Sequence, residues 1–314
     1  MEVKSKGVPR GRQSPIKRVD HPIRAVLNAL GRLDASKSRT LGKWFGRLWF
    51  ATAPRRYALA VRNIRCSFPE MGNSGFARHM ARQAFENIGQ TIFEVFRLGA
   101  LEPERLLEWV KFEGIEHYEK ALARGKGVLL LTAHLGNWEL LALTFPLVKE
   151  PGIAIARPLD FKPVDRYMEA LRSSTGNQVL SKDGSIRSVL NALKEGKNVG
   201  VLLDQNTSHR EGVFVPFFGR RACTNRSIAF LALATDCAVV PAYDNRLPSG
   251  RHVISIWPEL ELRRSGDKTR DIEDNTALFT RIIEQMIRKN PGQWLWMHNR
   301  WAQKPWSPWP RRSI

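Results

Sequence analysis

The sequence has few cysteines and no long hydrophobic segment. Its 314 residues include three cysteines, Cys66, Cys223 and Cys237, an odd number without close pairing. They form neither a disulfide framework nor the spacing of a zinc site, which favours a reducing compartment. No stretch reaches the roughly 18 to 20 apolar residues that cross a bilayer. No compact apolar segment follows the basic N-terminus, as it does in a cleavable signal peptide.

Motifs of two large enzyme classes are also absent. There is no Ser-centred nucleophile elbow and no phosphate-binding glycine loop, which argues against serine esterases and P-loop enzymes. We interpret Cys223, which has no obvious histidine partner, as a packing residue. We expect His209 to be solvated and His298 to pack among tryptophans. We predict no cofactor and no metal site, because isolated His and Glu residues fall short of a zinc set.

Acidic residues are outnumbered, with 30 Asp and Glu against 50 Lys and Arg, which gives a formal net charge of +20. This charge predicts an anionic partner, either nucleic acid, phospholipid or an acidic protein. Residues 1–65 hold 16 of the basic residues and only three acidic ones. The charge and the ten tryptophans leave nucleic-acid binding as an alternative. No recognisable binding motif supports it, so we predict no nucleic-acid partner.

The most apolar N-terminal segment is 44–53, flanked by Lys43 and Arg55 and ended by Pro54. It is too short and too charged to cross a membrane. In a membrane interface, its tryptophans would sink to headgroup depth while the basic residues face anionic lipid. The alternative is an ordinary amphipathic helix on a soluble core, and the segment alone does not decide between them.

The texture of the chain predicts three regions. Residues 1–20 are basic and rich in Gly and Pro, typical of a flexible tail. Residues 21–108 have helical periodicity, and we expect a helical membrane-associating region there. In 109–314, short apolar runs alternate with helical stretches, which indicates an α/β domain whose mainly parallel central sheet is flanked by helices. We predict strands at 128–132, 153–156, 199–203, 238–243 and 253–257, and helices at 138–148, 163–173, 185–194, 225–235 and 272–288.

Three successive predicted strands are followed by a functional side chain, namely His134, Arg157 and Asp204. Ligands of parallel sheets bind beyond the carboxyl ends of the strands, so we expect these side chains to share one cleft. An ion pair between Arg157 and Asp204 would orient the site. Alternatively, Arg157 holds a substrate phosphate.

Glu139 follows His134 by five residues. If the helix begins near Asn137, Glu139 lies in its first turn, where the helix N-terminus favours a carboxylate. From there it can lean back toward the imidazole. Such a pair would let His134 act as a general base for a hydroxyl. A His and a Glu at this spacing also occur together by chance, so a structural histidine is the alternative.

Five motifs, taken in order, resemble the late lipid A acyltransferases of Gram-negative bacteria, within the lysophospholipid acyltransferase superfamily. The resemblance runs from about Leu41 to Trp301. The matching segments are Ala-His-Leu-Gly-Asn-Trp-Glu at 133–139, Ala-Arg-Pro-Leu-Asp at 156–160, Leu-Asp-Gln-Asn at 203–206 with the apolar run 212–219, Arg-Asn-Ile-Arg at 62–65 with Phe-Pro-Glu at 68–70, and the tryptophan-rich 294–301.

The resemblance implies an enzyme that moves a fatty acyl group from acyl carrier protein, or from acyl-CoA, to a hydroxyl of a lipid A precursor or related glycolipid. It implies His134 as the general base and Glu139 as its partner, with Arg157 and Asp204 in support. It also implies anionic membrane lipid as a partner and the cytoplasmic face of the bacterial inner membrane as the location. An acyl thioesterase with the same dyad, or an acyltransferase for another membrane lipid, is the alternative.

Two further sets of residues are candidates for substrate contacts. Acyl transfer from a thioester needs donors for the oxyanion, and we expect Asn137 and backbone N–H groups near Gly136 to supply them. Phe217 and Phe218 are candidates for contact with the acyl chain, and Arg220 for contact with anionic headgroups or an acidic carrier protein. The alternative is that 212–219 is a buried strand and turn.

Overall fold

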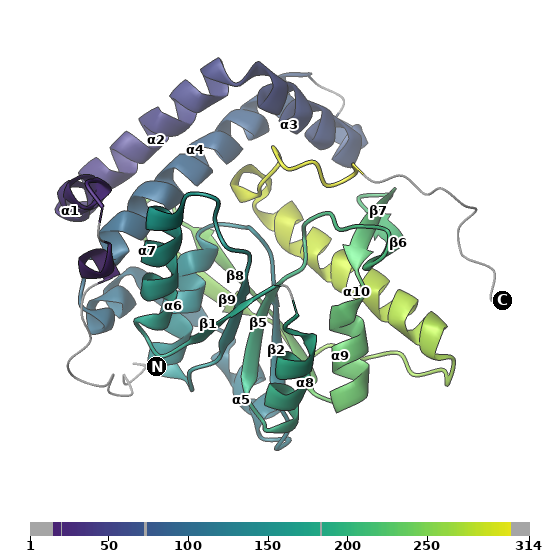
Figure 1. Cartoon of the computed structure of the whole chain (residues 1–314). Helices are drawn as coiled ribbons and strands as arrows, with labels where there is room; N and C mark the ends of the chain where they lie inside the picture. Colours follow the sequence, from purple (N-terminus) through teal and green to yellow (C-terminus); the bar gives the residue numbers. More distant parts are fainter. Residues whose placement is uncertain (1–14, 20, 72–73, 183, 303–314) are drawn as a thin grey trace.

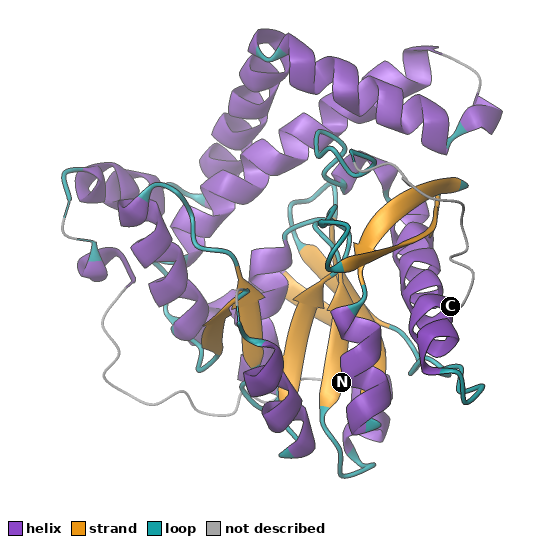
Figure 2. Cartoon of the chain, turned by 45° about the vertical axis from the view of Figure 1, so that its right-hand side comes forward, coloured by secondary structure: helices purple, strands orange, loops and turns teal. Residues whose placement is uncertain are grey.

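The structure is a computed structural model of the 314-residue chain and describes residues 15–19, 21–71, 74–182 and 184–302. A central sheet lies between layers of helices, and the N-terminal helices arch over one end of it (Figure 1; Figure 2). The predicted α/β class with a mainly parallel sheet flanked by helices is confirmed. Most of the predicted tail, 1–20, lies outside the described residues.

The helices and strands alternate through the second half of the chain. The helices are α1 (Ile23–Gly31), α2 (Ala35–Thr52), α3 (Pro54–Ser67), α4 (Ser74–Leu98), α5 (Ile115–Leu122), α6 (Trp138–Val148), α7 (Lys162–Ser173), α8 (Ile186–Lys194), α9 (Ser227–Thr235) and α10 (Lys268–Lys289), with short 3-10 turns η1 (Pro15–Arg18), η2 (Pro69–Met71), η3 (Pro103–Trp109) and η4 (Pro291–Gln293). The strands are β1 (Val110–Glu113), β2 (Val128–Thr132), β3 (Ile153–Ala156), β4 (Gln178–Ser181), β5 (Asn198–Leu202), β6 (Gly212–Phe217), β7 (Arg220–Asn225), β8 (Ala238–Arg246) and β9 (His252–Ile256).

The main sheet has seven strands in the order β1-β9-β8-β2-β5-β3-β4. β9 pairs antiparallel with β8 and parallel with β1, so β1 and β9 run opposite to the other five strands. β6 and β7 form a separate hairpin. The predicted bounds of β2 and β3 are confirmed. The hydrophobic pattern does not predict β1 and β4, because edge strands of four residues carry too few apolar positions.

Side chains of the central strands alternate between two cores, as the pleat of a strand requires. Val128, Leu130 and Val240 pack in a core with residues of α5 and α6. Leu129 and Leu131 face the other side, in a core formed with α3, α4, α8, α9 and α10. The N-terminal helices therefore belong to the same hydrophobic core as the sheet. Among the described helices, none combines the length and apolar character needed to traverse a bilayer.

Helices α2 and α4 lie side by side in close contact (Figure 1). Glycines stand where the two backbones meet, and a Cβ at Gly46 would come within 2.3 Å of the Phe85 carbonyl oxygen. A Cβ at Gly89 would come within 2.1 Å of the Gly42 carbonyl oxygen. Only glycine fits at these positions, because backbone atoms cannot move aside as a flexible side chain does.

Strand β8 extends beyond its neighbour β2, and its extra residues reach the inner face of α4. β2 pairs with β8 only as far as Pro241, whereas β9 accompanies β8 to Arg246. This overhang carries two charged side chains, Asp244 and Arg246, two residues apart and therefore on one face of the strand. His252, at the start of β9, lies opposite Arg246.

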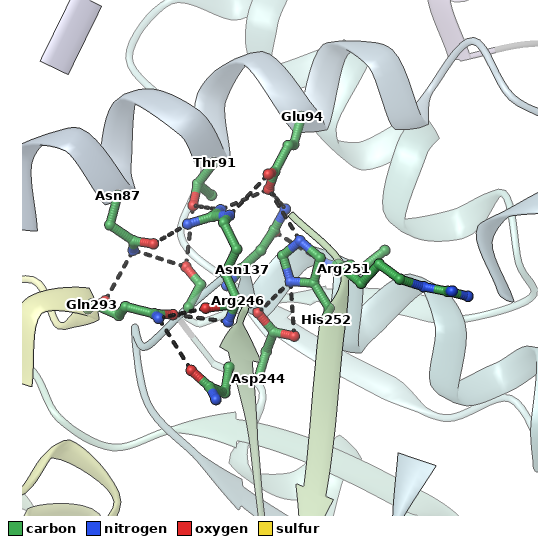
Figure 3. A network of polar contacts seen from close by, with 12 residues as sticks. Asn87, Thr91, Glu94, Asn137, Asp244, Arg246, Arg251, His252 and Gln293 are labelled. Atoms are coloured by element: carbon green, nitrogen blue, oxygen red, sulfur yellow. Dashed lines mark hydrogen bonds and ion pairs between the residues drawn. The ribbon is translucent and has the colours of Figure 1, made fainter. Parts of the chain in front are cut away.

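These charges are buried, and they form a cluster with Glu94 of α4, whose side chain is 14% exposed (Figure 3). Arg246 donates to the two oxygens of Glu94 at 2.9 and 2.6 Å. His252 Nδ1 lies 2.9 Å from an oxygen of Asp244, and its Nε2 lies 3.6 Å from Glu94. Two anions therefore face two cations, provided that His252 is protonated. Burial alone lowers the pKa of His252, but Asp244 and Glu94 more than compensate and raise it to about 9.

The cluster predicts how stability depends on pH. Because the pKa of His252 rises from 6.5 to about 9 on folding, its stabilising effect is complete below pH 6.5 and is lost as the pH rises through about 9. We expect His252→Gln to lower the free energy of unfolding by a few kcal/mol near pH 6, and the gap to wild type to shrink toward pH 10. Denaturant unfolding at several pH values measures this gap.

Arg251→Gln, at the exposed neighbouring position, is the matched control. Its difference from wild type should not change between pH 6 and pH 10, because arginine does not titrate there. A gap between His252→Gln and wild type that stays constant across that range would contradict the assignment of a charged His252.

Candidate functional site

His134 and Asp204 meet because two neighbouring strands end in register. β2 and β5 pair in parallel with Thr132 opposite Leu202, and each functional side chain follows two residues later. His134 Nδ1 lies 2.8 Å from Asp204 Oδ1, and the His134 backbone N–H donates to Asp204 Oδ2 at 2.9 Å. The expected juxtaposition of functional side chains at this edge of the sheet is confirmed for this pair.

The surroundings of Asp204 keep its carboxylate ionised. Burial alone raises its pKa, but the charge and hydrogen bonds of His134 and the indole N–H of Trp294 outweigh that effect and hold the pKa at about 2. An ionised carboxylate only accepts hydrogen bonds, so Nδ1 of a neutral His134 carries the proton. Nε2 then presents a lone pair, 3.3 Å from the amide nitrogen of Gln205. In this tautomer, His134 is ready to accept a proton from a substrate.

Glu139 does not meet His134 as predicted. α6 begins at Trp138, so Glu139 does lie in the first turn of the helix. Its two carboxylate oxygens, however, accept hydrogen bonds from Arg172 of α7 at 2.9 and 2.6 Å. Nδ1 of His134 is already bonded to Asp204. The predicted pairing of His134 with Glu139 is therefore wrong, because each side chain has a different partner, brought by another element of the fold.

The predicted ion pair between Arg157 and Asp204 is also wrong. β3 pairs with β5 only at Ile153 and Ala154, and it otherwise follows β4. The chain after β3 therefore diverges from Asp204. The Arg157 side chain is 78% exposed and lies 3.6 Å from Asp160. The alternative, a contact with a substrate phosphate, remains compatible with this exposed position.

Asn137 and Gly136 are held by the protein itself. Asn137 is fully buried, and its side-chain N–H₂ donates to Glu94 at 2.9 Å while its oxygen caps α6. Its backbone N–H donates to Asp244 at 2.6 Å. The N–H of Gly136 donates to the carbonyl of Gln293 at 3.2 Å. Neither residue lines the cavity beside His134, so the structure gives no support to these donors as an oxyanion site, and the assignment stays a prediction.

A cavity of about 940 Å³ opens beside His134. Glu139, Arg172 and Gln205 lie with His134 in its polar part. The cavity continues along β5 as far as Asn198, at the opposite edge of the sheet. Most of the remaining lining is apolar and comes from α4, α6, α7 and β3, including Ile88, Ile92, Val95, Phe96, Leu141, Phe145, Ile153, Ile155, Val164 and Met168.

Phe217, Phe218 and Arg220 do not line this cavity. Phe217 is fully buried, with its ring 5.7 Å from those of Trp294 and Trp301. The Arg220 guanidinium lies 3.9 Å from the centre of the Trp301 ring. The burial of Phe217 and Phe218 away from the cavity argues against their predicted contact with the acyl chain. The contact of Arg220 with an anionic headgroup or carrier protein stays a prediction. The alternative, a buried strand followed by a turn, describes β6.

The segment 294–301 closes the back of the site. His298 Nε2 accepts the backbone N–H of Asn206 at 3.0 Å. Burial lowers the pKa of His298 to about 4, which keeps the ring neutral and able to accept this bond. Asn63 of α3 donates to the carbonyls of Trp296 and His298 at 3.0 and 3.1 Å. Motifs from the two ends of the chain thus meet behind the His134–Asp204 pair.

Sequence reasoning misses Arg172, Gln205 and the role of Trp294. Arg172 lies in the last turn of α7, where a basic residue is common, so the sequence gives no functional signal. Gln205 and Trp294 lie within segments that carry the family resemblance, but their contacts depend on the fold. Among the described residues, no group of three or more His, Cys, Asp or Glu side chains is arranged to hold a metal ion.

Comparisons with known proteins identify the family of the chain. The family model described as bacterial lipid A biosynthesis acyltransferase matches residues 14–303. The lipid A biosynthesis lauroyltransferase of Escherichia coli (strain K12) is 28% identical over 268 residues, covering 84% of this chain and 85% of the relative. The lipid A biosynthesis palmitoleoyltransferase of the same strain is 25% identical with the same coverage.

Another relative is named for a different lipid. The phosphatidylinositol mannoside acyltransferase of Mycobacterium tuberculosis (strain ATCC 25618 / H37Rv) is 28% identical over 225 residues, or 69% of each chain. The family match extends over nearly the whole described structure, and the site and its cavity lie within it. The chain therefore belongs to the bacterial lipid A biosynthesis acyltransferase family.

Proposed function

We propose that this enzyme transfers a fatty acyl group from a carrier thioester to a hydroxyl of a lipid A precursor or related glycolipid. The observation that carries the proposal is the His134–Asp204 pair at the mouth of a largely apolar cavity. The pair supplies a base, and the cavity supplies space for a hydrocarbon chain. The lipid A and mannoside acyltransferases among the relatives support a glycolipid acceptor.

The proposed reaction uses His134 as the base in the first step and as the acid in the second. Nε2 takes the proton of the acceptor hydroxyl while its oxygen attacks the thioester carbonyl. Asp204, ionised and fixed by Trp294, stabilises the imidazolium that forms. When the tetrahedral intermediate collapses, the C–S bond breaks and the leaving thiolate takes the proton from Nε2. No change of oxidation state is involved.

The donor is proposed to be acyl carrier protein, with acyl-CoA as the alternative. A formal net charge of +20 attracts an acidic carrier. Two cations, Arg157 and Lys182, line the cavity and keep 78% and 49% of their side chains exposed. Either one can contact a phosphate of the donor or the acceptor. A comparison of turnover with acyl carrier protein and acyl-CoA carrying the same chain identifies the donor.

The enzyme is proposed to bind the cytoplasmic face of the inner membrane through α2. Leu41, Trp44, Phe45 and Leu48 recur at three- and four-residue steps and are all exposed, Trp44 by 62% and Leu48 by 63%. Basic residues stand among them, so the face combines an apolar stripe with positive charge. This combination is typical of helices that lie in an anionic membrane interface. α4 lies beneath α2 and lines the cavity with its inner face.

The catalytic assignment predicts that His134→Ala abolishes transfer and that Asp204→Asn lowers kcat by about 100- to 10,000-fold, because an amide neither stabilises the imidazolium nor fixes the tautomer. Mass spectrometry of the lipid product measures transfer. Asp236→Asn, at the other end of the sheet, is the control and should retain turnover.

If Glu139→Gln abolishes turnover while Asp204→Asn preserves it, Glu139 is the partner of His134. Free fatty acid in place of acylated lipid would indicate a thioesterase.

Gly200 provides a test of the acyl-chain site. It lines the cavity on β5, four residues before Asp204 and thus about 13 Å away along a parallel strand. A Cβ there meets only the Ile153 carbonyl oxygen, at 3.9 Å. An extended alkyl chain advances about 1.3 Å per carbon, so Gly200 lies beside roughly the tenth methylene.

We expect Gly200→Val to fold normally and to shift the preferred donor to a chain shorter by about two or more carbons, since its side chain fills space that the longer chain needs. Gly200→Ala is the matched control and should change the preference little. Turnover with donors of graded chain length measures the shift. An unchanged preference in Gly200→Val would place the acyl chain elsewhere.

The membrane assignment predicts that Trp44→Glu combined with Leu48→Glu releases the protein from anionic vesicles, because two new charges would have to enter the interface. Cosedimentation with vesicles that contain phosphatidylglycerol measures binding. Phe230→Glu, at an exposed aromatic residue of α9, is the control and should bind as wild type does. Equal binding by the double variant would remove α2 from the membrane contact.

A further inference from the structure

The turn between His134 and α6 is clamped by polar contacts from three directions (Figure 3). The Gly136 carbonyl accepts from Asn87 at 3.0 Å and from Thr91 at 3.1 Å, both on α4. The Gly136 N–H donates to the Gln293 carbonyl at 3.2 Å. The next N–H, that of Asn137, donates to Asp244 at 2.6 Å. Every backbone polar group between Gly136 N and Asn137 N is thus engaged.

The backbone at Gly136 packs tightly in a conformation that favours glycine. Gly136 has a φ of 63°, in the left-handed region that favours glycine. A Cβ on Gly136 would come within 2.3 Å of the backbone oxygen of Asp244 and 2.5 Å of its carboxylate. Leu135 forms an isolated antiparallel bridge with Trp294, the residue whose indole also holds Asp204. The backbone on the C-terminal side of His134 is therefore in contact with β8 and with the segment after η4.

The clamping side chains are in turn held by the buried charged cluster. Arg246 donates to Asn87 and, at 3.0 Å, to Thr91, in addition to its two bonds with Glu94. Its backbone N–H donates to the side chain of Gln293 at 2.9 Å. His252 holds Asp244 from the opposite side. The network is continuous from β9 to Gly136 and Asn137, the second and third residues after His134.

Stability alone does not account for this arrangement. Burying several charges costs desolvation energy, and an apolar cluster of equal volume is often as stable or more stable. An apolar cluster, however, has no directional bonds with which to orient one carbonyl and two N–H groups. The charges give directional, strong hydrogen bonds to a short segment beside the reacting imidazole.

We propose that Glu94, Asp244, Arg246 and His252 are positioning residues for His134, which set the path of residues 135–137 and thereby the placement of Nε2 relative to the cavity. The inference rests on the proposed role of His134 as general base. Asp244, Arg246 and His252 do not line the cavity, so they act through the backbone and not through substrate contact. They control the rate of the chemical step, not substrate binding.

Asp244→Asn tests the proposal. The amide can accept from Asn137 but places its own N–H₂ group against His252, so the clamp loosens. A displacement of a catalytic group by about 1 Å costs about 100-fold in rate. We therefore expect kcat to fall about 10- to 100-fold with KM for the acyl donor within about twofold of wild type. Rates are normalised to the folded fraction measured by circular dichroism.

Asp271→Asn is the matched control for a general loss of stability. Asp271 is another buried carboxylate that accepts backbone N–H bonds, from Ser265 at 2.7 Å, and it does not line the cavity. We expect this variant to lose stability while kcat stays unchanged. If Asp271→Asn and Asp244→Asn lower kcat equally, or if Asp244→Asn turns over like wild type, the positioning role is wrong.

A second pair of variants keeps the test decisive if Asp244→Asn does not fold. Thr91→Val removes the hydroxyl that donates to Gly136, and Thr91→Ser keeps it. We expect Thr91→Val to lower kcat several-fold and Thr91→Ser to retain it, whereas equal rates in the two would refute the clamp. His134→Ala separates this proposal from the proposed function. An inactive His134→Ala with a fully active Asp244→Asn overturns only the positioning role, while an active His134→Ala overturns both.

Discussion

The hydrogen bond between His134 and Asp204 is the interaction around which this structure is organised. The two side chains are 70 residues apart and meet only because β2 and β5 pair in parallel register. Trp294, in the segment after η4, also donates to the carboxylate, and Nε2 faces Gln205 on the other side of the ring. A shift by one residue would separate the imidazole from Asp204 and turn side chains of the strand to the opposite core. The chemistry and the packing therefore depend on the same alignment.

Helix α4 connects the other parts of the site. One group of its side chains, including Ile88, Ile92 and Val95, lines the cavity. Asn87, Thr91 and Glu94 reach the turn after His134 and the charged cluster, and Thr91 lines the cavity as well. Its remaining face packs against α2. The N-terminal helices thus form part of the wall around the cavity, and they share a core with the sheet.

The sequence predicts elements better than it predicts partners. Apolar runs locate β2 and β3 at their observed bounds, and the helix predicted at 138–148 matches α6. The rule that ligands gather at strand ends correctly identifies His134 and Asp204 as neighbours. The hydrophobic periodicity does not determine the order or extent of strand pairing, however, so the sequence wrongly pairs Arg157 with Asp204. Glu139 is likewise wrongly paired with His134 because the two are close in the sequence. Its actual partner, Arg172, is 33 residues away and reaches Glu139 only through the packing of α7. The sequence does not predict the cluster of Asp244 and His252, because charged residues at the end of an apolar run usually lie where the strand becomes exposed.

The glycines between α2 and α4 have a mechanical consequence. With backbone against backbone, no layer of side chains remains that can rearrange, so one helix cannot slide along the other unless the two separate. We therefore expect α2 and α4 to move together as one rigid unit. Whatever surface holds the outer helix also sets the height and tilt of the inner one, and with it one wall of the cavity. A tilt of α2 would therefore be passed directly to α4 and to the side chains of α4 that line the cavity.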